Sequence, residues 1–469
     1  MRLIVGKYLE YMIILLLYVS FFTFLATAQT SIKVSETNPP QNMVLLIVDG
    51  MGSGYVSQGM VPEALDGSRI IPPEVPFMDS LAAKGVLLPY IRVPDPRTGP
   101  AHSVIVTGHS GAEPEMVDYA GATIYDVLED EDFISIALMH KGDASGIRDE
   151  QDIILFSENN SVTEPYLKVR INGDAVPVGI INELEYWERQ LPGYLEGTTG
   201  IDSYIAYSDW ELDAAADMVS LMSGQYPDTK YILTINVGVV DSAGHYRGVE
   251  GYADAIEGVD RRLEPLYTAA RESDTALIIT ADHGMAFRTI NAARGGHASE
   301  GYRSPEALTV PLFIVSPNIV PGVIRDAHGQ EDVAPTILSV LDVAGRPKYG
   351  NGDTILVKDY ANLWVSSDND AGIEVLQGTN TIASSSGRNS YFFMGLKPKI
   401  NYTVRISNGD ELLEQVVHLD ADRAIRFGTS TVHVDGTSQD GENWRKVIAS
   451  ILILLVITGG MIVIYRIEH

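Results

Sequence analysis

The stretch "MVLLIVDGMG", residues 43–52, is an unbroken apolar run, Met43–Val48, that ends at Asp49 in a glycine-rich turn. A short apolar run without alternation is typical of a strand whose two faces are both buried, as in a parallel sheet. Three further runs share this pattern and are predicted to be strands of the same sheet: Tyr231–Val240, Ala276–Thr280 and Val310–Ser316.

Longer amphipathic segments lie between or after these runs and are predicted to be helices: Trp210–Gly224, Ala253–Ala270 and Val333–Ala344. This alternation predicts an α/β domain over residues 40–350, with a mainly parallel central sheet and helices on both faces. Residues 140–205 interrupt the alternation with Gly, Asn and Pro, and we expect an insertion or cap there.

The pattern changes after about residue 350. Short alternating runs such as "NYTVRIS" (401–407) and "STVHVDG" (430–436) are separated by Gly, Asn and Ser clusters. They predict a small β-sandwich-like domain over residues 355–436, followed by a polar linker at 437–446.

The two ends of the chain carry membrane signals. Residues 1–28 combine two basic residues, an apolar run and "ATA", as in a secretory signal peptide, although an uncleaved anchor is an alternative. Residues 447–465 are apolar and uncharged, which predicts a transmembrane helix, with a buried core helix as the alternative. Together they predict a single-pass protein of the cell membrane, with the domains between the two signals outside the cell.

Composition excludes several classes of partner and site. The 469 residues are 45% hydrophobic, enough for a folded core, and the net charge of −29 disfavours binding to nucleic acid. The chain has no cysteine, which rules out disulfides and thiolate metal sites. A metal ion would therefore be held by His, Asp, Glu or hydroxyl oxygen.

Polar residues follow three of the predicted strands directly. In open α/β sheets ligands bind beyond the carboxyl ends of the strands, so these residues would meet at one edge. The set is Asp49 in "VDGMG", Asp241 and His245 in "VVDSAGH", Asp282 and His283 in "TADHGM", and His297 in "RGGHAS". Singly, each aspartate is also explained as a turn or helix cap, and a histidine in a glycine loop as a surface residue. Together, these oxygen and imidazole donors suit divalent metal ions.

The charge balance of such a metal site favours one additional anionic oxygen, and the stretch "PRTGPAHSVIVTG", residues 96–108, contains a hydroxyl that could supply it. Three clustered aspartates without cations would raise one another's pKa values. Two divalent ions would balance three carboxylates and one alkoxide, and Thr98 is a suitable source of that alkoxide. Thr98 is thus either an ordinary turn residue or a nucleophile.

The motifs "VDGMG", "RTGPAHSVIVTG", "DSAGH", "TADHG" and "GGH", in this order, resemble the alkaline phosphatase superfamily. They are most similar to its type I phosphodiesterase/nucleotide pyrophosphatase and cofactor-independent phosphoglycerate mutase branches. The resemblance implies two divalent metal ions, zinc first, with manganese or iron as alternatives. One ion would be held by Asp241, His245 and His297, and the other by Asp49, Asp282 and His283, with Thr98 bridging them as nucleophile.

The chain departs from the diesterase pattern T-x-P-N because Ala101 stands where the Asn that holds a phosphate oxygen is expected. Four residues are candidates to replace that donor, with surface charge as the alternative for each: Arg97, His102, Lys141 and Arg294.

The expectation is a membrane-anchored extracytoplasmic phosphohydrolase that cleaves phosphate mono- or diesters through a phospho-threonine intermediate. The alternatives are a sulfatase-like hydrolase, a phosphomutase of the same superfamily, or a non-catalytic surface binding protein on this scaffold. The sequence predicts neither the oligomeric state nor the physiological substrate.

Overall fold

The computed structural model describes residues 30–141, 145–159, 161–409 and 411–428. These residues form two compact units. One is continuous, residues 38–359, and the other combines residues 30–37 with the chain from Tyr360 onward.

The unit of residues 38–359 is built on a ten-stranded sheet with the order β12-β3-β11-β8-β2-β7-β4-β5-β6, in which β13 also pairs with β3. Strands β2, β4, β5, β7 and β8 run parallel, while β6 and β11 are antiparallel to their neighbours. The prediction of a mainly parallel central sheet is confirmed. The strands are β2 (Asn42–Val48), β3 (Val86–Arg92), β4 (Ile134–Met139), β5 (Ile153–Ser157), β6 (Leu167–Ile171), β7 (Tyr231–Val237), β8 (Thr275–Thr280), β11 (Thr309–Val315), β12 (Gly322–Val323) and β13 (His328–Gly329).

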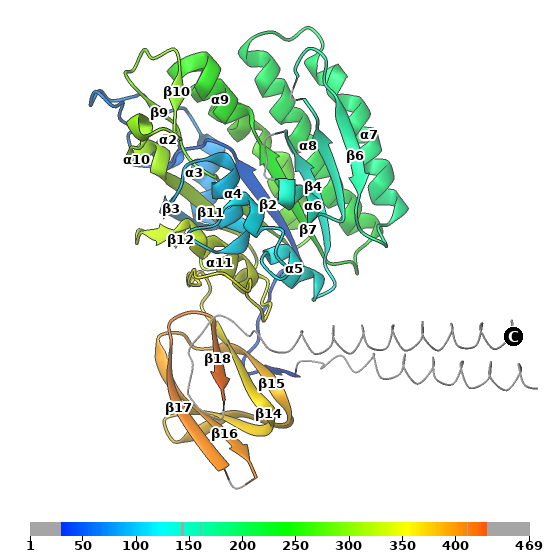
Figure 1. The fold of residues 1–469 in the computed structure, drawn as a ribbon, viewed down its shortest axis with the longest axis vertical. Coiled ribbons are helices and arrows are strands. Elements are labelled where there is room, and N and C mark those ends of the chain that lie inside the picture. The colour runs from blue at the N-terminus through cyan, green and yellow to red at the C-terminus, as the bar shows by residue number, and fades with distance from the viewer. Residues whose placement is uncertain (1–29, 142–144, 160, 410, 429–469) are drawn as a thin grey trace, which may run out of the picture. The chain divides into compact units, whose positions relative to one another are not determined.

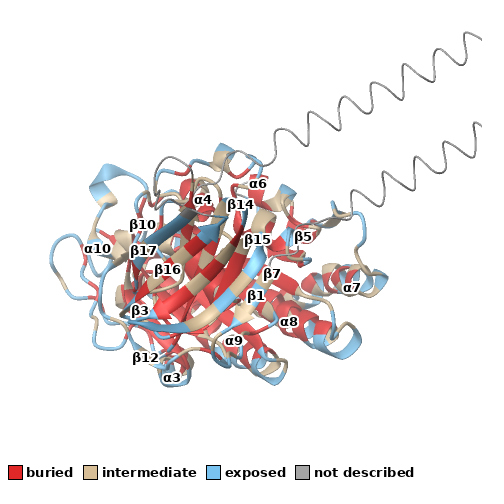
Figure 2. Cartoon of the chain, turned by 90° about the horizontal axis from the view of Figure 1, so that it is seen from below, coloured by how far each residue is buried: buried red, intermediate tan, exposed pale blue. Residues whose placement is uncertain are grey.

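Helices cover both faces of this sheet (Figures 1 and 2). One layer contains α3 (Pro76–Lys84), α7 (Val178–Leu195), α8 (Ile201–Gln225) and α9 (Val239–Glu272). The other contains α4 (Thr98–Thr107), α5 (Ile124–Glu129) and α11 (Val333–Val340). Shorter elements are α2 (Ser53–Val56), α6 (Ser145–Asp149), α10 (Pro305–Leu308), the strands β9 (Ala286–Phe287) and β10 (Gly295–Gly296), and 3-10 turns at 114–116, 300–302 and 330–332.

Burial explains why the opening stretch is a continuous apolar run. Residues 43–48 are each at most 1% exposed, because β2 is the central strand between β7 and β8 and is covered by helices on both faces. The outer helices are amphipathic instead: α7 buries Ile180, Leu184, Trp187, Leu191 and Leu195 toward the core, and its other residues are partly or fully exposed (Figure 2).

Two sequence-based boundaries need correction. Strand β7 ends at Val237, so the predicted strand extended too far, and Val239 and Val240 begin helix α9 instead. Residues 140–205, where we expected an insertion or cap, contribute β5 and β6 to the central sheet, and α7 packs against α8.

The second unit is a single six-stranded sheet with the order β1-β15-β14-β16-β17, in which β18 pairs with β14. Its prediction as β-rich is supported, but its strands form one hydrogen-bonded sheet rather than two. Bulges in the long strand β14 let β16 and β18 pair with different halves of it. The strands are β1 (Thr30–Lys33), β14 (Ala361–Gln377), β15 (Asn380–Leu396), β16 (Ile400–Asn408), β17 (Glu411–Leu419) and β18 (Arg423–Phe427).

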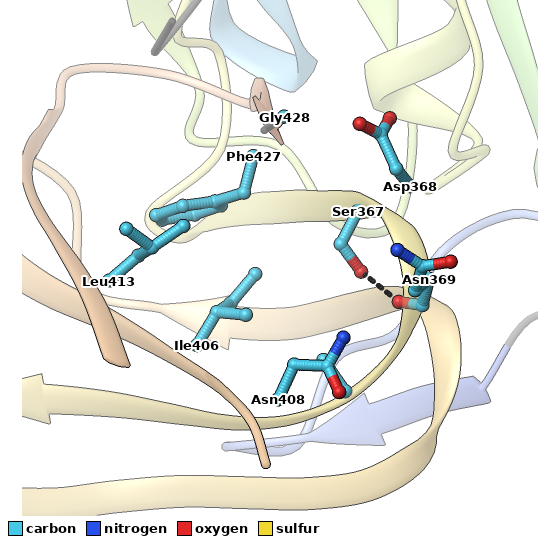
Figure 3. A pocket seen from close by; sticks show the side chains of 9 residues that line it. Ser367, Asp368, Asn369, Ile406, Asn408, Leu413, Phe427 and Gly428 are labelled. Carbon is cyan, nitrogen blue, oxygen red and sulfur yellow. Dashed lines mark hydrogen bonds between the residues drawn. The ribbon is translucent and has the colours of Figure 1, made fainter. Parts of the chain in front are cut away.

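A pocket lies within this β-unit (Figure 3). It is lined by apolar side chains, including Ile406, Leu413 and Phe427, and by polar side chains, including Ser367. The carboxylate at the rim, Asp368, is already paired with Arg426 at 3.0 Å. The pocket therefore lacks the clustered aspartates and histidines that the sequence predicts for the functional site.

No helix among the described residues is long and apolar enough to cross a membrane. The predicted signal peptide at 1–28, the "STVHVDG" run, the linker at 437–446 and the transmembrane helix at 447–465 all lie outside the described residues. They remain predictions.

A partly buried carboxylate makes the stability of the unit of residues 38–359 depend on pH. Burial, followed by the charge of Asp126, raises the pKa of Glu150 from 4.5 to about 7. Since the folded state binds this proton more tightly than the unfolded chain, the contribution of Glu150 to stability is present below pH 4.5 and is lost as the pH rises through 7.

Between pH 5 and pH 8, wild type should therefore lose about 1 to 2 kcal/mol more stability than Glu150→Gln, after allowance for solvent screening. Urea unfolding at the two pH values measures this difference. Glu164→Gln, at an exposed loop position, serves as the control and should follow wild type. Equal pH dependence in wild type and Glu150→Gln would contradict the assignment.

Candidate metal centre

The three strand-end aspartates come from neighbouring strands. Asp49 directly follows β2, Asp282 lies two residues after β8, and Asp241 lies in the first turn of α9, after β7. The strand order is β8-β2-β7, so the carboxyl ends of these three parallel strands lie side by side at one edge of the sheet, and the three aspartates lie there too. Backbone bonds join them: Asp241 N donates to Asp49 O (2.9 Å), and Gly50 N donates to Asp282 Oδ1 (3.0 Å).

The side chains form two groups of potential metal ligands. Asp49, Asp282 and His283 make up the first group, and Asp241, His283 and His297 the second, with the ligand atoms of each group within 4.8 Å of one another. His283 belongs to both groups, since its Nε2 lies 3.2 Å from Asp282 Oδ2 and 3.5 Å from Asp49 Oδ1, and its ring stacks on that of His297.

His245 adjoins the second group. Its Nε2 lies 3.3 Å from Asp241 Oδ1 and 3.0 Å from His297 Nε2. The i, i+4 spacing places Asp241 and His245 on one face of α9. The structure thus brings together all six predicted metal ligands.

The three histidines are oriented in the same way. Each Nδ1 is bonded to a backbone carbonyl oxygen: His245 to Gly295 (3.2 Å), His283 to Gly284 (3.1 Å) and His297 to Pro96 (2.5 Å). An Nδ1–H that donates to a carbonyl leaves the Nε2 lone pair available. All three Nε2 atoms face the carboxylates. A histidine protonated at Nδ1 can therefore bind a metal ion through Nε2.

The donor set fits divalent cations. Asp241 Oδ1 and Asp282 Oδ2 are buried and accept no hydrogen bond from the described residues. Buried acceptor atoms of this kind are costly unless a cation or water satisfies them. Carboxylate oxygen and neutral imidazole are the ligands that a borderline ion such as zinc takes when thiolates are absent.

The electrostatics of the second group favour the metal-binding protonation states. Burial raises the pKa of Asp241, but the close contact with His245 and the neighbouring imidazoles of His283 and His297 outweigh it, so the net shift is downward. Burial, followed by the charge of His283, lowers the pKa of His297 to about 4. At neutral pH Asp241 is therefore ionised and His297 is neutral.

Thr98 is the first residue of helix α4, and its Oγ1 lies 3.2 Å from His283 Nε2. The hydroxyl is thus next to the histidine shared by both ligand groups. The apolar run that follows, residues 104–106, is buried within α4, which packs against α11. A helix N-terminus carries unsatisfied N–H groups and a partial positive charge, both suited to an anion.

The four predicted phosphate-oxygen donors differ in placement. His102 is fully buried; its Nδ1 bonds to Thr98 O (2.8 Å) and lies 3.6 Å from Asp282 Oδ2, so it contacts the backbone at the start of α4. Arg97 is half-exposed and pairs with Asp95 (2.6 Å) and Glu113 (2.9 Å).

The other two candidates are exposed. Lys141 follows β4, the strand next to β7. Arg294 directly precedes Gly295, whose carbonyl is bonded to His245. Neither placement by itself assigns a contact to a substrate.

The sequence analysis missed two buried residues that hold the site together. Gln330 Nε2 donates to Asp282 O (2.7 Å) and Ala281 O (3.3 Å), and Tyr252 Oη bonds to the loop after Asp49. Neither residue lies in a motif, and both act across long sequence separations, so a single sequence carries no signal for them.

Comparisons with known proteins agree with this fold. The family model of the Metalloenzyme superfamily matches residues 193–344, which include five of the six predicted ligands. A 2,3-bisphosphoglycerate-independent phosphoglycerate mutase from Natronomonas pharaonis is 32% identical over 146 residues, covering 31% of this chain and 26% of that protein. A phosphopentomutase from Pectobacterium carotovorum is 30% identical over 173 residues, covering 37% of this chain and 36% of that protein.

Among solved structures, a variant of the alkaline phosphatase PafA is similar with a TM-score of 0.50 and 13% identity, covering 69% of this chain and all of that one. That similarity concerns the fold alone. The fold is α/β, and the donor set is that of a candidate metal site. The findings together support an alkaline phosphatase-like superfamily for this chain, although the matched segments span only 26% and 36% of the two mutases.

Proposed function

We propose that the chain is a two-metal phosphohydrolase that cleaves phosphate mono- or diesters through a phospho-threonine at Thr98. The observation that carries this proposal is the 3.2 Å contact of Thr98 Oγ1 with His283 Nε2, which also lies 3.5 Å from Asp49 Oδ1 and 3.2 Å from Asp282 Oδ2. A binding scaffold would not require a hydroxyl at the point shared by two ligand groups.

The proposed ligands are Asp49, Asp282 and His283 for one ion, and Asp241, His245 and His297 for the other. Bound divalent ions would lower the pKa of the Thr98 hydroxyl and offset the charge of the phosphate. Zinc is the ion we propose, because the donors are imidazole and carboxylate.

In the first step Thr98 Oγ1 attacks phosphorus, forming the Oγ1–P bond while the P–O bond to the leaving alcohol breaks, and the alcohol takes up a proton from solvent. In the second step water attacks the phospho-threonine, its oxygen bonds to phosphorus, and the Oγ1–P bond breaks. A monoester thus yields free Thr98 and inorganic phosphate, whereas a diester yields free Thr98 and a phosphate monoester.

The N-terminus of α4 is proposed to bind the non-bridging oxygens in place of the missing Asn. The backbone N–H groups of Thr98 and Gly99 are at the helix start, whereas Pro100 has none. Arg97 precedes them and adds positive charge.

Arg97→Ala is therefore expected to raise KM for a phosphate monoester about tenfold, with a smaller change in kcat. The effect is limited because Asp95 and Glu113 already share the guanidinium charge. Steady-state kinetics measure it, and Arg271→Ala, an exposed arginine at the end of α9, is the control. An unchanged KM in Arg97→Ala would remove Arg97 from the proposed phosphate site.

A substrate screen tests the class of reaction. The protein, loaded with zinc or manganese, is offered 4-nitrophenyl phosphate, bis(4-nitrophenyl) phosphate and 4-nitrophenyl sulfate, with Thr98→Ala in parallel. Turnover of either phosphate ester by wild type, but not by the variant, is expected. Turnover of the sulfate alone would replace the proposal with a sulfatase, and no turnover with any metal would favour the binding scaffold.

A phosphomutase is the second candidate, because both curated relatives described above are named mutases. Such an enzyme would transfer the phosphoryl group from Thr98 to another hydroxyl rather than to water. Adding a polyol acceptor to the nitrophenyl phosphate assay distinguishes a phosphomutase from a phosphohydrolase. A mutase releases more nitrophenol than inorganic phosphate, whereas a hydrolase releases equal amounts of the two.

We also propose that the protein is anchored in the cell membrane with its enzyme domain outside. Support comes from the apolar segment at 447–465 and the signal-like residues 1–28. Protease added to intact cells should degrade the enzyme domain, and full protection of that domain would contradict this orientation.

A further inference from the structure

The loop that carries Asp49 is held against helix α9 by a buried tyrosine hydroxyl. Tyr252 Oη donates to Gly50 O (2.6 Å) and accepts from Gly52 N (3.1 Å). Tyr252 is fully buried, so water does not replace these bonds. One hydroxyl thus satisfies a carbonyl and an amide on the two sides of Met51.

Helix α9 also holds the other parts of the site. The helix is kinked at Gly248, where φ is 72°. Before the kink are Asp241 and His245, and Asp241 N donates to Asp49 O. At the kink, Val249 N donates to Ala292 O (3.2 Å), in the loop that leads to His297. After the kink comes Tyr252, so both ligand-bearing loops are attached to one element.

The Asp49 loop has little room to relax on its own. Gly50 has φ of 82°, and a Cβ there would lie 2.8 Å from Asp241 Cα. The loop backbone is therefore pressed against α9, and the distance between the Asp49 and Asp241 carboxylates depends on how the loop is held.

We propose that Tyr252 is a positioning residue that preforms the Asp49, Asp282 and His283 metal site relative to the site on α9. This inference rests on the proposed two-metal function. The Tyr252 hydroxyl forms its hydrogen bonds with the loop backbone and not with a ligand side chain, so its effect on metal affinity is expected to act through Asp49.

Tyr252→Phe tests this role, and Tyr55→Phe is a matched control. The two rings are in edge contact with centroids 4.9 Å apart and both are buried, but Tyr55 Oη makes no hydrogen bond to the described residues. Each substitution removes one buried hydroxyl from the same place, and only one of them releases the loop.

The full-length metal-free protein is titrated with Co²⁺ and followed by calorimetry and by the visible absorption of the bound ion. Wild type and Tyr55→Phe should bind two equivalents. In Tyr252→Phe one equivalent should bind at least about tenfold more weakly, while the other is unchanged. Thermal denaturation of the metal-free proteins checks that all three fold.

The double variant Asp49→Asn with Tyr252→Phe distinguishes an effect of Tyr252 on the position of Asp49 from a general loss of structure around the metal sites. If Tyr252 acts through Asp49, the double variant should bind Co²⁺ as Asp49→Asn alone does. Two unchanged equivalents in Tyr252→Phe, equal weakening of both, or a further loss in the double variant would overturn the positioning role. A wild type that binds fewer than two equivalents would instead overturn the two-metal proposal on which it rests.

Discussion

Thr98→Ala is expected to lower kcat/KM for the best phosphate ester by about a thousandfold or more, because the reaction loses its nucleophile. Thr98→Ser keeps a hydroxyl at the start of α4 and should retain activity within about tenfold of wild type, since the oxygen alone forms the bond to phosphorus. Metal content of both variants, measured by elemental analysis, should remain at two ions, because six other side chains hold them.

A covalent readout makes this prediction sharper. Wild type quenched in acid during turnover should carry one added phosphoryl group on the peptide that contains Thr98, detected by mass spectrometry, and Thr98→Ala should carry none. Ser103→Ala, on the same helix, where the hydroxyl bonds to Gly99 O, is the matched control and should still be labelled. Full activity in Thr98→Ala, or a phosphoryl group on another residue, would contradict the nucleophile assignment.

Strands buried on both faces could be predicted closely from the sequence. The runs at 43–48 and 276–280 match β2 and β8 within one residue, because polar residues mark both ends of each strand. Strand β7 was overextended because Val239 and Val240 are apolar in either state: they are buried in the first turn of α9 just as they would be in a strand. The local sequence pattern does not distinguish the end of a buried strand from the first turn of a buried helix.

Other strands could not be predicted from the sequence, because they form only through pairing with segments that are distant in the chain. Strand β1 is only four residues long, and it is a strand because it pairs with Tyr391–Met394 of β15. Strands β5 and β6 lie in a Gly-, Asn- and Pro-rich region. They belong to the central sheet only because β5 pairs with β4 and β6 pairs with β5. Contacts of this kind are absent from the local sequence.

The same distinction holds for the site. Asp49, Asp282 and His283 could be predicted as neighbours because each follows a recognisable strand in a short motif. His102 was expected near a substrate, whereas its complete burial depends on how α4 packs, which composition does not reveal. Tyr252 and Gln330 contact loops 200 and 48 residues away in sequence, so their roles follow only from the three-dimensional contacts.

Asp49→Asn should change stability in opposite directions with and without metal. In the metal-free protein, Asp49, Asp241 and Asp282 repel one another, so removing one charge should raise Tm. With Zn²⁺ at about 100 times its Kd, wild type should gain about 2.7 kcal/mol for each occupied site, and the variant should lose this gain at the Asp49 site. Thermal denaturation with EDTA and with Zn²⁺ measures the change in Tm under each condition.

Asp260→Asn is the control for the Asp49→Asn prediction. Asp260 accepts hydrogen bonds from Phe77 N and Met78 N at the start of α3, so this variant should lose stability equally with and without Zn²⁺. A fall in Tm for Asp49→Asn that is the same with and without Zn²⁺ would mean that Asp49 supports the fold and not a metal ion.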